Sequence, residues 1–192
     1  MWILPLNKSH SFKIRMASHA LQQGRIIAYP TESVYGLGCD PFNEVAALEL
    51  LALKQRPIHK GLILIASDFS QLTPFIKPNE AMLERILPSW PGPVTWVVPA
   101  QDWVPSYLKG HHNSLAVRVS AHPVVQQLCQ QFNGAIISTS ANISQQAPAR
   151  SALAVRQHFS ENEVFVVAGK TSQLNQPTPI YSAIDGRCLR SA

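Results

Sequence analysis

The chain has 192 residues, of which 46% are hydrophobic and 14% are charged, and its formal net charge is +5. This composition excludes a disordered chain and predicts one domain, residues 1–192, with a sizeable buried core. No apolar run approaches the ~20 residues that a membrane span needs, and residues 1–15 hold no continuous apolar segment of a secretory signal. We therefore expect a cytoplasmic protein without a membrane partner. The three cysteines are far apart and lack metal-ligand spacing, which predicts reduced thiols.

The chain alternates helix and strand patterns. Apolar residues at helical spacing predict a helix over residues 11–23, and a strand over residues 25–29 follows. Two glycines predict a turn over residues 35–39, after which Asp40 or Asn43 caps a helix. The remaining expected elements are helices over residues 44–53, 69–72, 80–87, 123–132 and 151–159, strands over 61–66, 94–98, 114–120, 135–137 and 164–167, a loop over 101–113, and turns from residue 169 onward. This order predicts an α/β fold.

A cluster of cations, Lys54, Arg56 and Lys60, follows a predicted helix, and no acid lies between Glu49 and Asp68. Cations held where a helix passes into a buried strand suit the binding of an anion. Lys and Arg at a helix C-terminus also complement the helix dipole on a solvated surface. This stretch alone therefore leaves both interpretations open.

A long acid-free segment adds to this positive charge. Residues 103–160 contain no Asp or Glu, whereas Lys109, Arg118, Arg150 and Arg156 lie within them. Such a segment predicts a polyanionic partner or a phosphate-bearing substrate, and charge alone does not distinguish the two. Alternation along its strand puts Arg118 on the opposite face from its apolar neighbours, where it can face a cleft.

Two clusters of small polar residues end predicted strands. Residues 31–33 follow one strand, and residues 138–142 follow another. Ligands of α/β sheets bind beyond the C-terminal ends of strands, so these clusters predict a site that binds phosphates and a carboxylate. The sequence has no G-x-x-x-x-G-K-[ST] loop and no complete dinucleotide loop, so side chains must hold any phosphate.

The same residues are open to other chemistry. Ser138 or Ser140 is a candidate nucleophile with Lys54 as its base, although no G-x-S-x-G elbow surrounds either serine. Glu32 is a candidate Mg²⁺ ligand or base, and it equally suits the capping of a turn. The sequence alone identifies no set of metal ligands.

Histidine and aromatic residues give weaker indications. His111 and His112 are adjacent, so their side chains point to different sides of an extended chain, which predicts a solvated loop rather than a metal site. Four aromatic residues are candidates for base stacking, but aromatics beside apolar strands more often belong to the core. These are Trp90, Trp96, Trp103 and Tyr107.

Five segments stand out in order along the chain: PTESVYGLG (30–38), KQRP (54–57), WPGPVT (90–95), AVRV (116–119) and STSAN (138–142). Each is modest alone, but the ordered set with its K-x-R and S-x-N pairs is specific. Together they resemble the signature segments of the YrdC-like threonylcarbamoyl-AMP synthases, over essentially the whole chain and at the length of the short bacterial type with a single YrdC-like domain. The resemblance implies an open, twisted, mixed sheet flanked by helices around a positively charged central cavity.

The resemblance also implies an enzyme, a nucleotidyltransferase. Its substrates would be L-threonine, bicarbonate and ATP, with Mg²⁺ accompanying the ATP, and its products threonylcarbamoyl-AMP, pyrophosphate and water. Proteins of the TsaD, TsaB and TsaE type would then transfer the threonylcarbamoyl group to the adenosine next to the anticodon of tRNA. The enzyme would thus carry out the first step of this tRNA modification.

Eight residues acquire roles from the resemblance. Lys54 and Arg56 would be the catalytic cations that hold the ATP phosphates, and Ser140 and Asn142 would complete the ATP site. The residues implied to bind threonine are Thr31, Arg118, Ser138 and Thr178, with the Arg118 fork pairing with the carboxylate. Catalysis would consist mostly of positioning and charge neutralisation, without a covalent enzyme intermediate.

A function of a different class also fits the basic residues. An RNA-binding module would use the same cavity to hold double-stranded RNA or rRNA without chemistry. Weak RNA binding is also compatible with the enzyme. A third interpretation, a serine–lysine amidase, requires Ser138 or Ser140 to react with an acylating inhibitor.

Overall fold

The computed structural model describes residues 8–172, 174 and 176–191. Nine strands lie within them: β1 (Ile26–Pro30), β2 (Tyr35–Gly38), β3 (Ile63–Ala66), β4 (Thr95–Pro99), β5 (Ser114–Val119), β6 (Ile136–Ser140), β7 (Val164–Val166), β8 (Ile180–Ser182) and β9 (Cys188–Arg190). They form one sheet in the order β7-β1-β2-β6-β3-β5-β4-β8-β9. Three pairs are parallel, β1 with β7, β3 with β5 and β4 with β8, and the other pairs are antiparallel. The predicted open mixed sheet is therefore confirmed.

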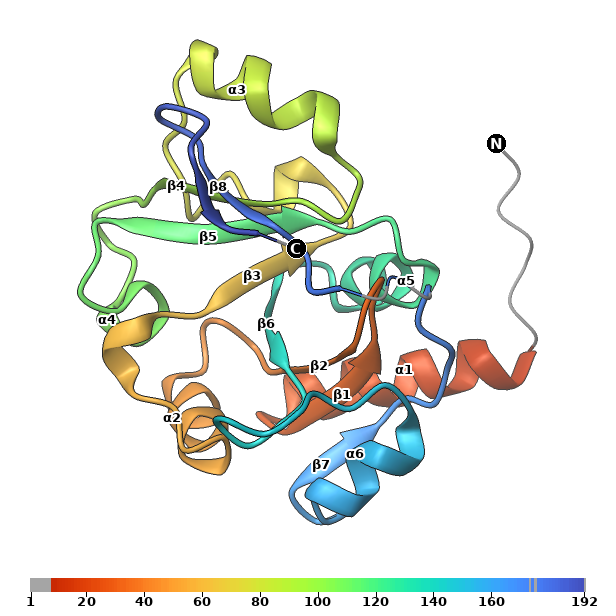
Figure 1. Cartoon of the computed structure of the whole chain (residues 1–192). Coiled ribbons are helices and arrows are strands. Elements are labelled where there is room, and N and C mark those ends of the chain that lie inside the picture. The colour runs from red at the N-terminus through yellow and green to blue at the C-terminus, as the bar shows by residue number, and fades with distance from the viewer. Residues whose placement is uncertain (1–7, 173, 175, 192) are drawn as a thin grey trace.

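Helices flank this sheet (Figure 1). They are α1 (Lys8–Gln22), α2 (Glu44–Leu53), α3 (Glu80–Ile86), α4 (Ser106–Lys109), α5 (Pro123–Phe132) and α6 (Ala152–His158). Helices α1 and α5 pack against each other and against β1, in the same region of Figure 1. Within the described residues, no helix combines the length and the apolar character that crossing a bilayer requires.

Alternation along the strands divides the buried residues between two cores. In β1, Ile27 and Tyr29 pack with α1 and α5, whereas Ile26 and Ala28 belong to the larger core that includes α2. Likewise, Ile65 of β3 belongs to the core with α1 and α5, and Leu64 belongs to the larger core with α2. Successive side chains of a strand point to opposite faces, so the central strands must be apolar on both. Polar side chains are confined to the ends of these strands and to the segments that follow them.

The helix ends follow from capping residues. The Asn43 side chain accepts a hydrogen bond from the Ala46 amide (3.0 Å) and begins α2. Helix α5 begins at Pro123 and ends at Phe132, and its C-cap Asn133 takes the left-handed conformation with φ of 62°. The predictions of helices over residues 44–53 and 123–132 are confirmed residue for residue.

Residues 35–38 form strand β2, so the prediction of a turn over residues 35–39 is wrong. The two glycines in it serve close packing. A Cβ on Gly36 would lie 3.2 Å from Cζ of Tyr29, and a Cβ on Gly38 would lie 2.2 Å from the Ile137 carbonyl oxygen. The sequence also predicted a strand that ends at residue 137, with the polar residues 138–142 after it. This boundary is wrong. Strand β6 continues to Ser140, which pairs with Gly36.

Two strands occupy the C-terminal segment that was predicted to consist of turns. Strand β8 pairs in parallel with β4, and β9 pairs with β8. The Thr95 amide donates to the Pro179 carbonyl (3.1 Å) at the start of this pairing. Both strands have three residues, too few for a periodic pattern to indicate them. The predicted loop over residues 101–113 also contains the short helix α4.

We expect Gly38→Ala to lower the free energy of unfolding by about 2 kcal/mol or more, because the new methyl group would overlap the Ile137 carbonyl between two paired strands. Urea denaturation followed by circular dichroism measures this change. Gly134→Ala is the matched control, because its Cβ would meet only the Phe132 ring at 3.8 Å. Equal stability of the two variants would contradict the packing role of Gly38.

Candidate active site

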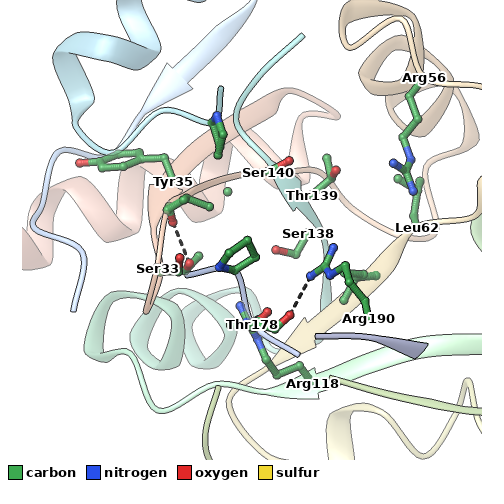
Figure 2. Close-up of a pocket in the computed structure, with 16 residues that line it drawn as sticks. Ser33, Tyr35, Arg56, Leu62, Arg118, Ser138, Thr139, Ser140, Thr178 and Arg190 are labelled. Atoms are coloured by element: carbon green, nitrogen blue, oxygen red, sulfur yellow. Dashed lines mark hydrogen bonds between the residues drawn. The ribbon is translucent and has the colours of Figure 1, made fainter. Parts of the chain in front are cut away.

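A pocket of about 220 Å³ opens over the middle of the sheet (Figure 2). Its walls come from β2, β5 and β6, from the residues just before β3, and from the C-terminal segment. The polar lining residues are Thr31, Ser33, Tyr35, Arg56, Arg118, Ser138, Thr139, Ser140, Thr178 and Arg190. The sheet order β2-β6-β3-β5 explains the gathering, because it places these segments side by side although they are distant in the sequence.

Three arginines line this pocket. Arg56 donates from Nη2 to the Gly61 carbonyl (2.9 Å), and Arg190 donates from Nη2 to the Thr178 carbonyl (2.8 Å). Arg118 donates from Nη1 to the Thr178 hydroxyl (3.0 Å), and its Nη2 lies 3.5 Å from Oε2 of Glu32. Burial lowers the pKa of Arg56 and of Arg190, and a neighbouring arginine adds to the effect in each case. The guanidinium groups therefore repel one another, which an anionic ligand would relieve.

Thr178 connects two of these arginines. Its hydroxyl accepts from Arg118 and its carbonyl accepts from Arg190. The segment that carries Thr178 is attached to the loop after β1, because the Ser33 hydroxyl donates to the Gln176 carbonyl (2.7 Å). The prediction that Thr178 belongs to the site thus acquires a geometric basis, since this residue fixes the pocket side chains of β5 and β9.

Lys54 is absent from the pocket lining. The residue is 3% exposed, and its Nζ donates to the carbonyls of Ser140 and Asn142, the latter at 2.7 Å. Burial, aided by the charge of Arg56, lowers the pKa of Lys54 to about 8. Its ammonium thus holds the turn that follows β6. The contact of Lys54 with the ATP phosphates stays a prediction.

Asn142 is placed by the same turn. Its Nδ2 donates to the carbonyls of Ile143 (2.8 Å) and Gln146 (2.9 Å). Its Oδ1 is buried and accepts no hydrogen bond from the described residues. Asn142 is absent from the pocket lining, whereas Ser140, two residues earlier, belongs to it. The turn thus presents one hydroxyl to the pocket and keeps an unused amide oxygen beside it.

Thr31 and Ser138, which the resemblance implies to bind threonine, both line the pocket. The Thr31 hydroxyl already donates to the Val34 carbonyl (2.7 Å), which leaves its oxygen free to accept. Ser138 is 6% exposed and follows the apolar part of β6. Six of the eight predicted residues, all but Lys54 and Asn142, thus line one pocket.

Among the described residues, neither a Lys54–Ser140 hydroxyl contact nor a cluster of metal ligands is found at the pocket. Lys54 bonds to the carbonyl of Ser140 and not to its hydroxyl. No His, Asp or Glu is among the pocket lining, and the described residues contain no group of three or more His, Cys, Asp or Glu that could hold a metal ion. His111 and His112 are exposed, in agreement with the predicted solvated loop.

Sequence reasoning missed two polar residues of the site. Arg190 enters the pocket from β9, a strand with no sequence pattern of its own. Tyr35 lies in β2, and its hydroxyl donates to the Gly169 carbonyl (2.6 Å) and accepts from the Gly169 amide (2.9 Å). A sequence signal existed only for Tyr35, which stands inside the segment PTESVYGLG.

Fold and site together define the class: a mixed α/β protein with an arginine-lined pocket over its central strands. Comparison with known proteins identifies a narrower class of protein. The threonylcarbamoyl-AMP synthase of Methylococcus capsulatus is 47% identical over 180 residues, which cover 93% of this chain and 97% of that protein. The enzyme of the same name from Serratia proteamaculans is 52% identical over 174 residues, which cover 89% of this chain and 92% of that protein.

Solved structures and a family description agree with these relatives. P. abyssi Sua5 complexed with L-threonine superposes with a TM-score of 0.82 at 31% identity, covering 93% of this chain and 53% of that one, so the chain spans about half of Sua5. E. coli YciO has the same fold at a TM-score of 0.82 and 22% identity, covering 94% of this chain and 89% of its own. Residues 19–192 match the family of Sua5, YciO and YrdC, described as "Telomere recombination". The chain belongs to this family.

The depressed pKa of Lys54 predicts a pH-dependent contribution to stability. The unfolded chain binds this proton with a pKa of 10.5 and the folded protein with a pKa of about 8. Stability should therefore rise as pH increases from 8 to 10.5, by about 3 kcal/mol relative to Lys54→Met. Urea denaturation of both proteins across this pH range measures the difference between their free energies of unfolding. The contributions of the other titrating groups cancel in this difference. Parallel pH profiles would contradict the burial of this ammonium.

Proposed function

We propose that this protein synthesises threonylcarbamoyl-AMP from L-threonine, bicarbonate and ATP, with release of pyrophosphate and water. The names of relatives 45–52% identical over most of the chain support this reaction. One structural observation carries it further. A single pocket combines one arginine attached to the central sheet, Arg118, with two others, Arg56 and Arg190, that reach it from separate segments. This is the donor set needed to bind a carboxylate beside a polyphosphate.

Arg118 is the proposed ligand of the threonine carboxylate. It is 6% exposed and is held by Thr178 at one Nη, and its Nε has no partner among the described residues. A guanidinium with unused N–H groups in a buried setting binds a carboxylate strongly, because the bonds are charge-assisted. Thr31, Ser138 and Thr178 supply hydroxyls around it.

The proposed ATP site lies around Arg56, Arg190 and Ser140. In Figure 2, Ser138 lies between Arg118 and the neighbouring pair Thr139 and Ser140, so both ligands would meet near this serine. Lys54 contributes by holding the carbonyls of Ser140 and Asn142, as a positioning residue for the turn. Asn142 offers a buried amide oxygen as an acceptor for a nucleotide N–H.

The proposed chemistry requires positioning more than acid–base groups. The threonine amine adds to the carbon of bicarbonate and water leaves, which gives a carbamate. A carbamate oxygen then attacks the α-phosphorus of ATP, and pyrophosphate leaves with the electrons of the broken P–O bond. The lining side chains provide hydroxyls and guanidinium groups that orient the substrates and offset the charge of the phosphates.

The residues present do not fit a protein-held Mg²⁺. The pocket lining contains no carboxylate, and Glu32 lies behind it, paired with Arg118. Mg²⁺ prefers oxygen ligands and commonly binds substrate phosphates while keeping several waters. We therefore propose Mg²⁺ only as a companion of ATP, with no carboxylate ligand from the described residues.

The proposed product is an acyl-adenylate, a mixed anhydride that water destroys. A downstream protein must therefore accept the threonylcarbamoyl group soon after its release. We propose proteins of the TsaD, TsaB and TsaE type for this transfer to tRNA, on the basis of the sequence resemblance. Localisation in the cytoplasm, where tRNA is modified, fits this proposal.

Pyrophosphate release tests the reaction. We expect purified protein to release pyrophosphate from ATP only when both L-threonine and bicarbonate are present. Arg56→Ala should lower this rate by about 100-fold or more, because a cation that offsets phosphate charge is worth several kcal/mol in such sites. Lys77→Ala is the control for loss of one cation, since Lys77 pairs with Asp102 on the surface. A rate of pyrophosphate release that does not depend on L-threonine would contradict the proposed reaction. RNA binding whose salt dependence falls by about one unit in Arg56→Ala would favour the RNA-binding module instead.

Substitution of Arg118 tests the placement of threonine. Arg118→Lys keeps the charge beside Glu32 but loses the planar fork. We expect the KM for threonine to rise about tenfold or more and the KM for ATP to stay within about twofold, since each lost tenfold corresponds to ~1.4 kcal/mol of binding. Steady-state kinetics with each substrate varied in turn measure this. An equal rise in both KM values would argue against separate subsites.

A further inference from the structure

Glu32 is a buried acid directly behind the pocket. It is 4% exposed and is absent from the pocket lining. Its Oε1 accepts hydrogen bonds from the Ser120 hydroxyl (2.7 Å) and the Ala121 amide (3.1 Å). Its Oε2 accepts no hydrogen bond from the described residues and lies 3.5 Å from Nη2 of Arg118. One carboxylate oxygen is thus fixed to the backbone after β5, and the other faces the arginine.

This ion pair distinguishes Arg118 from the other two arginines of the pocket. Arg56 and Arg190 donate to the backbone carbonyls of Gly61 and Thr178, which are dipoles and leave the full positive charge in place. Within the described part of the chain, neither has a carboxylate within ion-pair distance. The pocket therefore contains two uncompensated cations and one compensated cation.

We propose that Glu32 is a specificity-determining residue: its charge reserves Arg118 for a net-neutral amino acid and leaves Arg56 and Arg190 to the polyanionic ligand. The inference rests on the proposed function, in which one pocket must bind both kinds of ligand. Without the charge of Glu32, a phosphate group could bind to any of the three arginines and prevent threonine from binding to Arg118.

The physical basis is the charge of each ligand. Repulsion between Glu32 and an anion bound to Arg118 grows in proportion to the charge of the anion, and burial strengthens it. A phosphate with two negative charges meets this repulsion in full. An α-amino acid carries an ammonium next to its carboxylate, so attraction of the ammonium offsets part of the repulsion. Hydrogen bonds from the guanidinium to the carboxylate remain available, because Arg118 lines the pocket and each of its terminal nitrogens carries two N–H groups.

Titration with inorganic phosphate tests the proposal without relying on activity. We expect Glu32→Gln to bind phosphate about tenfold more tightly than the wild type by isothermal titration calorimetry at low ionic strength. Phosphate should also displace L-threonine from this variant and not from the wild type. Asp102→Asn is the control, because it changes the net charge equally but removes an exposed carboxylate paired with Lys77.

A second variant identifies the arginine responsible. Glu32→Gln combined with Arg118→Gln should lose the added phosphate binding, since the uncompensated cation is gone. Equal phosphate affinity in the wild type and Glu32→Gln would overturn the proposal, and so would an equal gain in Asp102→Asn. If Glu32→Gln does not fold, the wild type alone decides: displacement of bound threonine by phosphate would overturn the proposal, and its absence at phosphate concentrations that displace ATP would support it.

The outcomes separate this inference from the proposed function. Failure of the wild type to bind threonine would contradict the proposed function, whereas the phosphate affinities of the variants would still report the charge effect of Glu32. Pyrophosphate release that requires threonine, together with unchanged phosphate affinity in Glu32→Gln, would preserve the function and remove the role of Glu32.

Discussion

The burial of positive charge constrains this structure more than any other feature. Lys54 and Arg118 are almost fully buried and Arg56 is partly so, while the exposed Arg190 reaches the same pocket from the edge strand β9. Buried cations are costly unless acceptors surround them, and here most acceptors are backbone carbonyls at the ends of strands and turns. The polypeptide around the pocket is therefore shaped by the need to satisfy these cations. A site held in this way is rigid before any ligand arrives, which suits catalysis by positioning.

The order of the strands in the sheet brings together residues that are far apart in the sequence. Strand β6 is inserted between β2 and β3, so the polar end of β6 meets both the loop after β1 and the segment after α2. The parallel pairing of β8 with β4 then brings Thr178 against Arg118, and β9 adds Arg190. Each of these contacts joins segments with separate local patterns, which is why the pocket depends on the whole sheet.

Local signals in the sequence predicted the elements that local physics determines. Asn43 caps α2, and Pro123 and Asn133 bound α5, because capping depends on the residue at the helix end. Strand β2 was missed because its glycines indicate a turn, whereas their role is to admit Tyr29 and the Ile137 carbonyl. Strands β8 and β9, and with them Arg190, were missed because only the pairing of β8 with β4 and of β9 with β8 makes them strands. The burial of Lys54 could not be predicted either, since a charge cluster does not indicate which of its side chains points inward.

The distribution of carboxylates decides what a pocket of this kind can discriminate. Three arginines alone would attract any anion, and their mutual repulsion would make that attraction strong but unselective. A single buried carboxylate changes the electrostatics of one arginine without entering the pocket, because it lies behind the guanidinium and is held by Ser120 and Ala121. The pocket then contains two charge environments side by side, while its polar lining side chains remain hydroxyl and guanidinium groups. Discrimination between an amino acid and a nucleotide is thereby a property of the fold behind the site as well as of the residues that touch the ligands.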